Sequence, residues 1–496
     1  MQVTKEASLK DLIDIVGSEN YFDSPEVLDS FSRDYSFAPP RRPKAVVKVK
    51  EAAIARQVVE WANLTKTPLI PVSSGEPHFR GDTVPSVGNC VIIDLSEMKK
   101  IIKVNRLNRY TIIEPGVTYP QLQQELKRFG MKVPMPLLPK LKKSVLTSLL
   151  EREPVMMPNI QWTLLDPLAC VDIIWGCGKE YVTGEAHSNV RMGALEEQWK
   201  RNMDQVFPYG PGMWDAHRIV SGAQGTMGIV VWASIRCELI PQEYVMCFIT
   251  SEKLDVLLKF LSKFLRFRYG DEILLLNNWN LASILCKKTA EIEGVASILP
   301  RWTLIITLAG YDILPKERVA FQLEDTQDLA QQFGLKIQHS IPDVVDGEQM
   351  YELLNKPSDD PYWKMRWKGA FQEIFLLTTI DKIAEFVSLM ISIANNAGYP
   401  VSQIGCYIQP LHQGVTYHVE FDLPYNPTKP EETKQVKNIL IKASDELYRH
   451  GAYFSRPYGI WSEIIYGRNY ASTYVLKELK KIFDPNNIMN PGKLCF

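Results

Sequence analysis

Apolar positions in the first 240 residues switch between short runs typical of strands and stretches with helical spacing. Strands are predicted at 45–49 and 69–72, with a helix between them at 51–65. A strand, a helix and a second strand in this order predict a β-α-β unit. Further strands are expected at 91–94 and 111–114, followed by a helix at 119–129 that Thr118 begins as its cap.

From 160 to 240 the pattern becomes one of strands joined by loops, and Pro241 ends it. The strands in this region are predicted at 170–175, 180–183 and 228–237. After Pro241, helices predicted at 254–267, 317–333, 380–397 and 431–450 alternate with strands at 303–308, 373–379, 405–410 and 417–423. Two β-α-β-like passages that face an antiparallel sheet predict an α+β fold. A final amphipathic helix is expected from residue 470.

Composition excludes several classes of protein. A chain of 496 residues is too long for one hydrophobic core, and a net charge of −1 offers no basic face for nucleic acid. The eight cysteines form no CxxC pair, which argues against a zinc ribbon or an iron–sulfur cluster and favours free thiols in a reducing compartment. No apolar run approaches the ~20 residues that span a bilayer, and segment 1–17 lacks a signal-peptide core. We therefore expect a cytoplasmic protein without a membrane span or a nucleic-acid partner.

Three glycine-bearing turns stand at the ends of predicted strands, at 71–82, 113–122 and 221–230. In the first turn, Gly75 and Gly81 bracket five residues, and exposed backbone N–H groups in such a loop can cradle a phosphate. Glu76 and Asp82 argue against a bound anion there, whereas Arg80 argues for one. The small residues of the other two turns allow the backbone to approach a flat ligand closely. Three such turns in one α/β region indicate a bound ligand rather than surface loops.

The order of these segments resembles the vanillyl-alcohol oxidase/4-cresol dehydrogenase superfamily of FAD-linked oxidases, which is related to the D-lactate/glycolate oxidases. The resemblance is carried by Pro71–Pro85, Val91–Leu95, Glu114–Leu122, Gly222–Val230 and the C-terminal Asp-Pro-Asn-Asn…Asn-Pro-Gly-Lys at 484–493. It implies a two-lobed, PCMH-type FAD-binding domain at 1–240 and an α+β substrate (cap) domain at 241–460. The segment 461–496 would return to complete the FAD-binding domain.

The resemblance also implies which residues contact FAD. These are Ser73, Ser74, Gly75, Gly81, Pro115, Gly116, Ser144, Gly222, Gly225, Thr226, Gly228 and Ile229. Two segments depart from the family pattern: Glu76–Arg80 lacks the usual glycines and serines, and lysines stand at Lys142 and Lys143 in place of glycines. These lysines either face a phosphate or the flavin, or, as we favour, extend into solvent from a loop.

Four catalytic residues are implied by the phenol-oxidising branch: Tyr119 after Gly-Val-Thr, Asp166, and the late pair Tyr453 and Arg456. Two phenols and a guanidinium would stabilise a phenolate or carboxylate while hydride leaves for the flavin. Asp166 would act as the base. The alternatives are a structural tyrosine, a turn-capping aspartate and a surface arginine.

His412 and His418 allow two readings within the same resemblance. In the vanillyl-alcohol oxidase branch a histidine near here carries the flavin covalently, and His418 is the nearest match. In the D-lactate/glycolate branch a histidine pair at similar spacing ligates a divalent metal, but the late Glu-His-Gly motif of that branch reads Arg-Pro-Tyr-Gly at 456–459. We therefore predict no metal. Because side chains alternate along a strand, His418 and Glu420 are expected on one face.

The sequence thus predicts an FAD-dependent oxidoreductase that oxidises a small hydroxyl- or phenol-bearing substrate by hydride transfer to the flavin. One alternative is a hydroxy-acid dehydrogenase of the D-lactate/glycolate type. Another is a cofactor-free subunit that binds a partner. Beyond the small-molecule substrate, we expect a homo-oligomer or a complex with an electron-acceptor subunit, and covalent attachment of FAD is left open.

Overall fold

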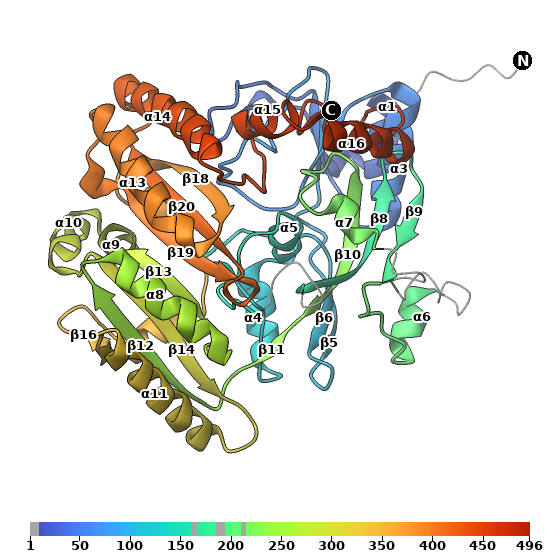
Figure 1. Ribbon diagram of the computed structural model, residues 1–496. Coiled ribbons are helices and arrows are strands. Elements are labelled where there is room, and N and C mark those ends of the chain that lie inside the picture. Colours follow the sequence, from blue (N-terminus) through green and yellow to red (C-terminus); the bar gives the residue numbers. More distant parts are fainter. Residues whose placement is uncertain (1–8, 160–165, 185–193, 210–214) are drawn as a thin grey trace, which may run out of the picture.

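The computed structural model describes residues 9–159, 166–184, 194–209 and 215–496. Two N-terminal lobes lie on one side of the molecule and a seven-stranded sheet with its helices lies on the other (Figure 1). The predicted α+β class is confirmed, because parallel and antiparallel sheets occur in separate parts of the chain.

The first lobe is built on a four-stranded sheet of order β1-β2-β4-β3, in which β2, β4 and β3 run parallel. Its strands are β1 Tyr21–Phe22, β2 Ala45–Lys48, β3 Leu69–Val72 and β4 Val91–Asp94, and its helices are α1 Leu9–Val16, α2 Pro25–Ser30 and α3 Ala52–Thr65. Every residue of β4 is buried, as expected for a parallel strand covered on both faces. The predicted β-α-β unit is therefore confirmed as β2-α3-β3.

The second lobe contains a five-stranded antiparallel sheet of order β5-β6-β10-β8-β9. Its strands are β5 Ile101–Asn105, β6 Tyr110–Ile113, β8 Leu168–Trp175, β9 Glu180–Val182 and β10 Gly228–Arg236, with helices α4 Tyr119–Lys127, α5 Val145–Leu150, α6 Leu195–Lys200 and α7 His217–Val220. Thr118 begins α4 with the predicted cap, since it forms a capping box with Gln121. A two-stranded sheet of β7 Met131–Lys132 and β11 Glu238–Leu239 follows, and Pro241 lies just beyond it.

The large sheet has the order β15-β12-β14-β13-β19-β20-β18 and is antiparallel throughout. Its strands are β12 Glu243–Ser251, β13 Ile273–Asn277, β14 Trp302–Gly310, β15 Ile337–Gln338, β18 Ala370–Thr378, β19 Gly405–Leu411 and β20 Thr416–Tyr425. Two β-α-β passages are present. The one made of β18, the helix α13 (Ile380–Asn396) and β19 encloses β20 and was predicted, whereas the one made of β12, the helix α8 (Leu254–Phe264) and β13 encloses β14 and rests on two strands that were not predicted. A short hairpin of β16 Ser340–Ile341 and β17 Val345–Asp346 lies outside this sheet.

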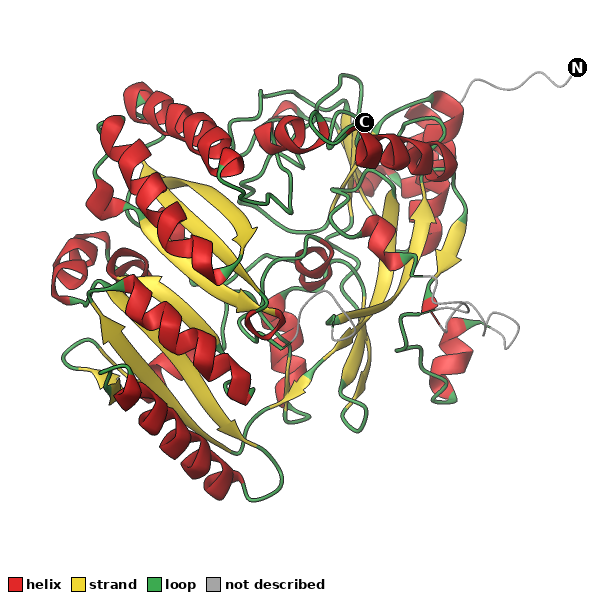
Figure 2. Ribbon diagram, in the orientation of Figure 1, coloured by secondary structure: helices red, strands yellow, loops and turns green. Residues whose placement is uncertain are grey.

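The two faces of this sheet bury different partners. One face carries a layer of long helices, α8 Leu254–Phe264, α11 Pro315–Gln332, α13 Ile380–Asn396 and α14 Pro430–Arg449 (Figure 2). The other face packs against α9 Asn278–Leu285, α10 Thr289–Ile298, α12 Gly347–Leu354 and residues of the lobes such as Leu137. Because side chains alternate along β12, Cys247 joins the first core and Phe248 the second.

The C-terminal segment returns to the first lobe, as predicted. After α15 Ile460–Tyr466 and α16 Tyr470–Phe483, the chain runs beside β3. The Leu69 N–H donates to the Ile488 carbonyl at 2.7 Å, and the Asn490 N–H donates to the Leu69 carbonyl at 2.8 Å. The last residues thus extend the edge of the parallel sheet.

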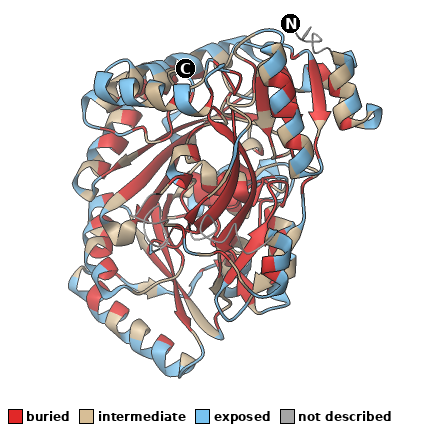
Figure 3. Cartoon of the chain, turned by 90° about the vertical axis from the view of Figure 1, so that its right-hand side faces the viewer, coloured by how far each residue is buried: buried red, intermediate tan, exposed pale blue. Residues whose placement is uncertain are grey.

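Most residues of the strands are buried, whereas the outer helices carry many exposed residues (Figure 3). All eight cysteines lie in the described part of the chain, none of them forms a disulfide, and six are buried. In the described part of the chain, no helix has both the length and the apolar character needed to cross a membrane.

Candidate functional site

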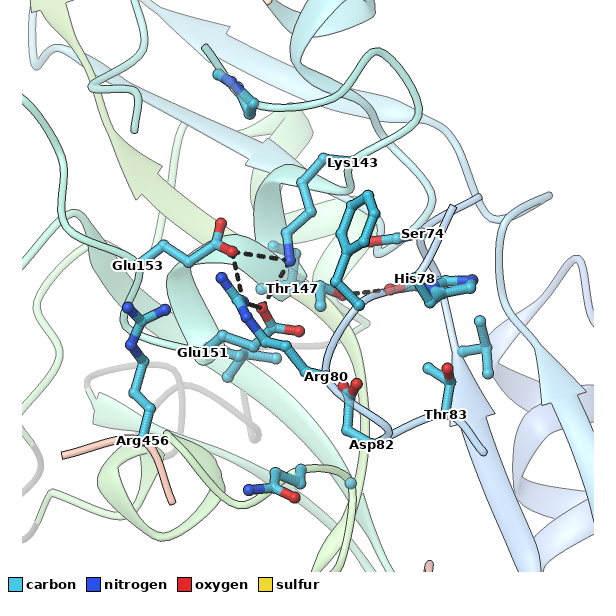
Figure 4. Close-up of a pocket in the computed structure, with 18 of the residues that line it drawn as sticks. Ser74, His78, Arg80, Asp82, Thr83, Lys143, Thr147, Glu151, Glu153 and Arg456 are labelled. Carbon is cyan, nitrogen blue, oxygen red and sulfur yellow. Dashed lines mark hydrogen bonds and ion pairs between the residues drawn. The ribbon is translucent and has the colours of Figure 1, made fainter. Parts of the chain in front are cut away.

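A long cavity lies between the two lobes and the inner face of the large sheet. Its walls come from loops after β3 and β6, the segment that includes α5, the turn before β10, and residues of the large sheet and its connections. Figure 4 shows part of this wall, with side chains from both lobes and from the C-terminal half pointing toward one another.

Part of the cavity wall presents backbone N–H groups and a lysine. The loop after β3 contributes to this part of the wall, and several of its amides donate no hydrogen bond within the described residues, among them those of His78, Phe79, Arg80, Asp82 and Thr83. Lys140 lines the same cavity, and its Nζ donates to the Gly75 carbonyl at 2.7 Å and to the Pro77 carbonyl. Unpaired amides beside an ammonium group suit a phosphate. Burial first, and Lys143 second, lower the pKa of Lys140 to about 7.

A four-residue ion cluster stands in the middle of the cavity wall (Figure 4). The Nη1 of Arg80 lies 2.7 Å from Glu151 and 2.7 Å from Glu153. The Nζ of Lys143 lies 2.6 Å from Glu151 and 3.2 Å from Glu153. The Arg80 guanidinium also reaches Glu373 of β18 at 3.6 Å, so this cluster joins the lobes to the large sheet. Our expectation that the two lysines extend into solvent is wrong for Lys143, which is buried by this pairing, and holds for the exposed Lys142.

The members of this cluster shift one another's pKa values. Burial opposes the charge on Arg80 and on Lys143, but the surrounding glutamates more than offset it and raise the pKa of both groups. Burial likewise opposes ionisation of Glu153, yet Lys143, Arg80 and Arg456 hold its pKa well below the usual range. For Glu151, burial and the neighbouring Glu153 prevail and raise the pKa. The pKa values of the two carboxyl groups in this cluster are therefore shifted in opposite directions, upward for Glu151 and downward for Glu153.

A second cluster lies at the end of the cavity formed by the large sheet. The Lys364 Nζ contacts Glu373 at 2.7 Å, Glu420 at 2.5 Å and Asp422 at 3.0 Å. Burial opposes the charge of Lys364, but the three carboxylates hold its pKa well above the usual range. Within the described chain, these carboxylates form the one group of histidine, cysteine or acidic side chains spaced closely enough to share a metal ion, and the Lys364 ammonium lies among them.

Arg456 brings an unpaired guanidinium to the same end. Its side chain is 2% exposed and lines the cavity, and Nη1 and Nη2 make no hydrogen bond to any described residue. The guanidinium stacks 4.0 Å from the centre of the Phe375 ring. Burial, and then the nearby Arg80, lower the pKa of Arg456. A buried guanidinium without a carboxylate is costly unless an anion pairs with it.

The residues predicted to contact FAD fall into two groups in the structure. Those that line the cavity are Ser73, Ser74, Pro115, Gly225, Gly228 and Ile229. Those that stand behind the wall are Gly75, Gly81, Gly116, Ser144, Gly222 and Thr226, and each makes hydrogen bonds to protein.

The residues behind the wall shape it through protein–protein contacts. The Gly75 amide donates to the Lys142 carbonyl at 2.9 Å, and the Gly81 amide to the Asp34 carboxylate at 2.7 Å. A Cβ at Gly116 would lie 2.4 Å from the Ser96 carbonyl oxygen. These glycines are thus required by the close approach of neighbouring backbone and side chains.

The catalytic residues predicted from sequence are not brought together. Tyr119 is buried away from the cavity lining, and its hydroxyl donates to Ser148 Oγ at 3.0 Å. Asp166 accepts the Leu168 N–H at 3.0 Å and lies 3.9 Å from His217. Tyr453 is 57% exposed. Of these four predicted residues, Arg456 is the one that lines the cavity.

His418 and Glu420 do share one face of β20, as predicted, with the His418 Nε2 lying 3.2 Å from the Glu420 carboxylate. His418 is buried behind the cavity lining, and burial lowers its pKa. His412 is not part of the carboxylate group around Lys364.

Sequence reasoning missed Glu151, Glu153, Lys364 and Glu373. The available signal was the appearance of charged residues where the loops depart from their small-residue pattern, at Arg80 and Lys143. Such unexpected cations in a buried loop call for carboxylate partners elsewhere in the chain.

Comparisons with known proteins agree with this architecture. A family model described as an FAD binding domain matches residues 43–140, and one described as the C-terminal domain of FAD linked oxidases matches residues 418–494. The first covers the loop with the unpaired amides, and the second covers β20 through the returning tail.

Relatives with similar sequences span nearly the whole chain. A D-2-hydroxyglutarate dehydrogenase of Stutzerimonas stutzeri (strain A1501) is 23% identical, with 99% of each chain covered. A D-lactate dehydrogenase of Anaerostipes hadrus is 22% identical over 92% of this chain and 90% of its own. Among solved structures, p-cresol methylhydroxylase with substrate bound matches with a TM-score of 0.81 at 17% identity, covering 98% of this chain and 96% of that one.

The two lobes, the large sheet over the cavity and the returning tail define a two-domain flavoprotein fold. The chain carries the FAD binding domain and the C-terminal domain of FAD linked oxidases, at residues 43–140 and 418–494, and its cofactor is FAD. The cavity fits this group, because unpaired amides and Lys140 suit the pyrophosphate and an apolar wall including Leu146, Met227 and Ile229 suits a flat ring. These matches overturn the alternative of a cofactor-free subunit.

Proposed function

We propose that this FAD-dependent oxidoreductase oxidises a small hydroxyl-bearing substrate whose anionic group, a phenolate or a carboxylate, pairs with Arg456. The observation that carries the proposal is the buried guanidinium of Arg456, which faces the cavity without a partner among the described residues. FAD accepts a hydride when it oxidises such substrates. The protein supplies the charged and aromatic surroundings that orient the substrate.

Aromatic side chains at the same end of the cavity favour a ring-bearing substrate. Phe79, Tyr362, Trp363 and Tyr407 line it, and Phe79 stacks on Tyr362 with ring centres 5.5 Å apart. A phenolic alcohol would place its ring against these side chains and its phenolate at Arg456. Burial of an aromatic ring in such surroundings contributes beyond the area it covers.

A small 2-hydroxy acid is the second candidate, favoured by the likeness along the whole chain to proteins named as D-2-hydroxyglutarate and D-lactate dehydrogenases. Its carboxylate would take the place of the phenolate at Arg456. We place it second because the three carboxylates that could hold a divalent metal beside such a substrate, those of Glu373, Glu420 and Asp422, are already paired with Lys364. His412 and His418 do not belong to that group.

The test is anaerobic reduction of the bound flavin, followed by its absorbance. The probes are 4-hydroxybenzyl alcohol, D-lactate and D-2-hydroxyglutarate. Reduction by 4-hydroxybenzyl alcohol supports the phenolic assignment, and reduction by either acid alone supports the second candidate. If none of the three reduces the flavin, the proposal is overturned.

Arg456→Met should weaken binding of the active probe about 10- to 100-fold, because a hydrogen bond to a charged group contributes roughly 1.5–3 kcal/mol. Arg456→Lys retains the positive charge but lacks the planar guanidinium, so its affinity for the probe should lie between those of the wild type and Arg456→Met. Bound-flavin content, which should not change, is the control. Equal affinity in all three proteins would contradict the role of Arg456.

A further inference from the structure

The structure leaves one oxygen of Glu151 available in the wall of the cavity. Glu151 follows directly after α5 and lines the cavity. Its Oε2 is held by Arg80 at 2.7 Å and by Lys143 at 2.6 Å. Its Oε1 has no hydrogen-bond partner among the described residues. The side chain is 12% exposed, so two cations fix the carboxylate while one oxygen remains open.

The other glutamates that line the cavity are fully engaged. Glu153 uses Oε1 for Arg80 and Lys143, and its Oε2 accepts the Ser148 hydroxyl at 2.5 Å. Glu373 contacts Lys364 with one oxygen and Arg80 with the other. Glu420 contacts Lys364 with one oxygen and His418 with the other. Among these four glutamates, Glu151 alone offers a free acceptor.

We propose that Glu151 is the catalytic base of the oxidation, with its Oε1 accepting the proton of the substrate hydroxyl. This assignment rests on the proposed function and replaces Asp166, which does not line the cavity. The substrate O–H bond breaks and its proton passes to the carboxylate. The C–H bond of the same carbon breaks and its electron pair leaves as a hydride, which the bound FAD accepts. The carbon–oxygen bond becomes a carbonyl, so the substrate loses two electrons and the flavin gains them.

The surroundings of Glu151 suit a proton acceptor. Burial, Glu153 of the same segment and Asp82 of the loop after β3 raise the pKa of Glu151, while Lys143 and Arg80 lower it. The net direction is upward, toward neutral pH, and a general base is most effective when its pKa lies near the pH at which it acts. The two cations also hold the carboxylate in one orientation, so no rearrangement is needed before proton transfer.

The experiment compares Glu151→Gln with Glu153→Gln. Both variants replace a carboxylate of the same cluster by an amide and leave the same two cations, so Glu153→Gln measures the effect of disturbing the cluster without removing the free oxygen of Glu151. With 4-hydroxybenzyl alcohol as the probe, we expect Glu151→Gln to slow flavin reduction by about 100- to 10,000-fold, the usual contribution of a general base. The loss in Glu153→Gln should be at least about 10-fold smaller. Equal losses in the two variants, or no loss in Glu151→Gln, would overturn the assignment.

A second measurement needs no substrate. The absorbance of the bound oxidised flavin is titrated with pH in the wild-type protein and in both variants. A spectral transition should be present in the wild type and in Glu153→Gln and absent from Glu151→Gln. Persistence of the transition in Glu151→Gln would overturn the assignment, even if no probe reduces the wild-type flavin and the proposed function itself fails.

Should Glu151→Gln not retain FAD, Glu151→Asp takes its place. This variant keeps the charge but withdraws the oxygen by one carbon–carbon bond. Its flavin reduction should be slowed at every pH while the spectral transition remains. A rate equal to that of the wild type would count against Glu151.

Discussion

Lys140 shows how one buried side chain links cofactor affinity to pH. Its ammonium group lies beside the unpaired amides of the loop after β3, and burial and Lys143 lower its pKa to about 7. A bound pyrophosphate would stabilise the charged form and raise this pKa. Binding of FAD above pH 7 therefore takes up a proton at Lys140.

We expect the dissociation constant for FAD to increase with pH above about 7, by at most about tenfold per pH unit, because one proton is involved. The measurement is FAD rebinding to the apoprotein between pH 6 and 9. Lys140→Met should bind FAD more weakly at pH 6 and lose this pH dependence. The exposed neighbouring Lys142→Met is the matched control. The same slope in Lys140→Met as in the wild type would contradict the prediction.

Residues of the site were predictable from sequence where the backbone is constrained locally. Glycines at strand ends, such as Gly225 and Gly228, stand out in this way, whereas Arg456 was named through the family resemblance, and all three line the cavity. The four-residue ion cluster could not be found because its members lie at residues 80, 143, 151 and 153, and its further contact lies at residue 373. Pairing across such sequence distances depends on the tertiary fold, and no local pattern encodes it.

At the scale of elements, the C-terminal tail closes the loop after β3. The Asn490 Nδ2 donates to the Asp82 carbonyl at 3.0 Å and to the Gln224 carbonyl at 2.8 Å, so one side chain bridges two turns of the cofactor cavity. The Lys493 Nζ donates to the Gly81 carbonyl at 2.6 Å. Asp484 holds the start of the tail through the amides of Ile488 and Met489.

Asn490→Ala should therefore weaken FAD retention by about 5- to 100-fold, because it removes two hydrogen bonds of roughly 0.5–1.5 kcal/mol each. The measurement is the fraction of flavin released on dilution, followed by its fluorescence. Asn486→Ala is the control, since Asn486 belongs to the same tail but bonds the exposed end of α3 through Asn63. Equal release from both variants would show that the tail acts only as a whole.

The elements themselves were predicted best where the apolar pattern has a clear period. β3 and β4 have the bounds expected from sequence, and α13 ends within one residue of its predicted end. The strands β12 and β13 were missed. In β13 four consecutive apolar residues are buried, and periodicity alone cannot assign such a short run to a strand. No element was predicted at α5, since a six-residue helix leaves little periodic signal.

Across the whole molecule, a buried ion cluster joins the lobes to the large sheet away from the cavity. Lys132 of β7 contacts Glu272 at 2.5 Å and Asp271 at 3.8 Å, and both acids precede β13. Burial and Glu272 raise the pKa of Asp271 to about 6. A raised carboxyl pKa means that the folded protein binds this proton more tightly than the unfolded chain. Its stabilising contribution is therefore present below about pH 4 and is lost as pH rises through about 6.

Asp271→Asn should abolish this loss, because asparagine does not titrate. Relative to the wild type, the free energy of unfolding of the variant should increase by about 2 kcal/mol between pH 4 and pH 7, at 1.36 kcal/mol per unit of pKa shift. Urea unfolding at both pH values measures the difference. Tyr311→Phe removes the hydrogen bond to Asp271 but leaves the carboxylate, so it should keep the pH-dependent loss. If the free energies of unfolding of Asp271→Asn and the wild type differ by the same amount at both pH values, the titration of Asp271 does not cause the loss of stability.

The return of the tail to β3 also sets an order of events during protein synthesis. Leu69 and Met489 are paired across 420 positions of the chain, which at roughly 5–20 residues per second corresponds to about 20–80 s of elongation. Throughout that interval β3 of the nascent first lobe has an unpaired edge, and the loop after β3 lacks the hydrogen bonds that the tail donates to it. We therefore expect stable loading with FAD to await the final residues, so that a chain cut short before the tail is made stays colourless and distinguishable from the finished protein.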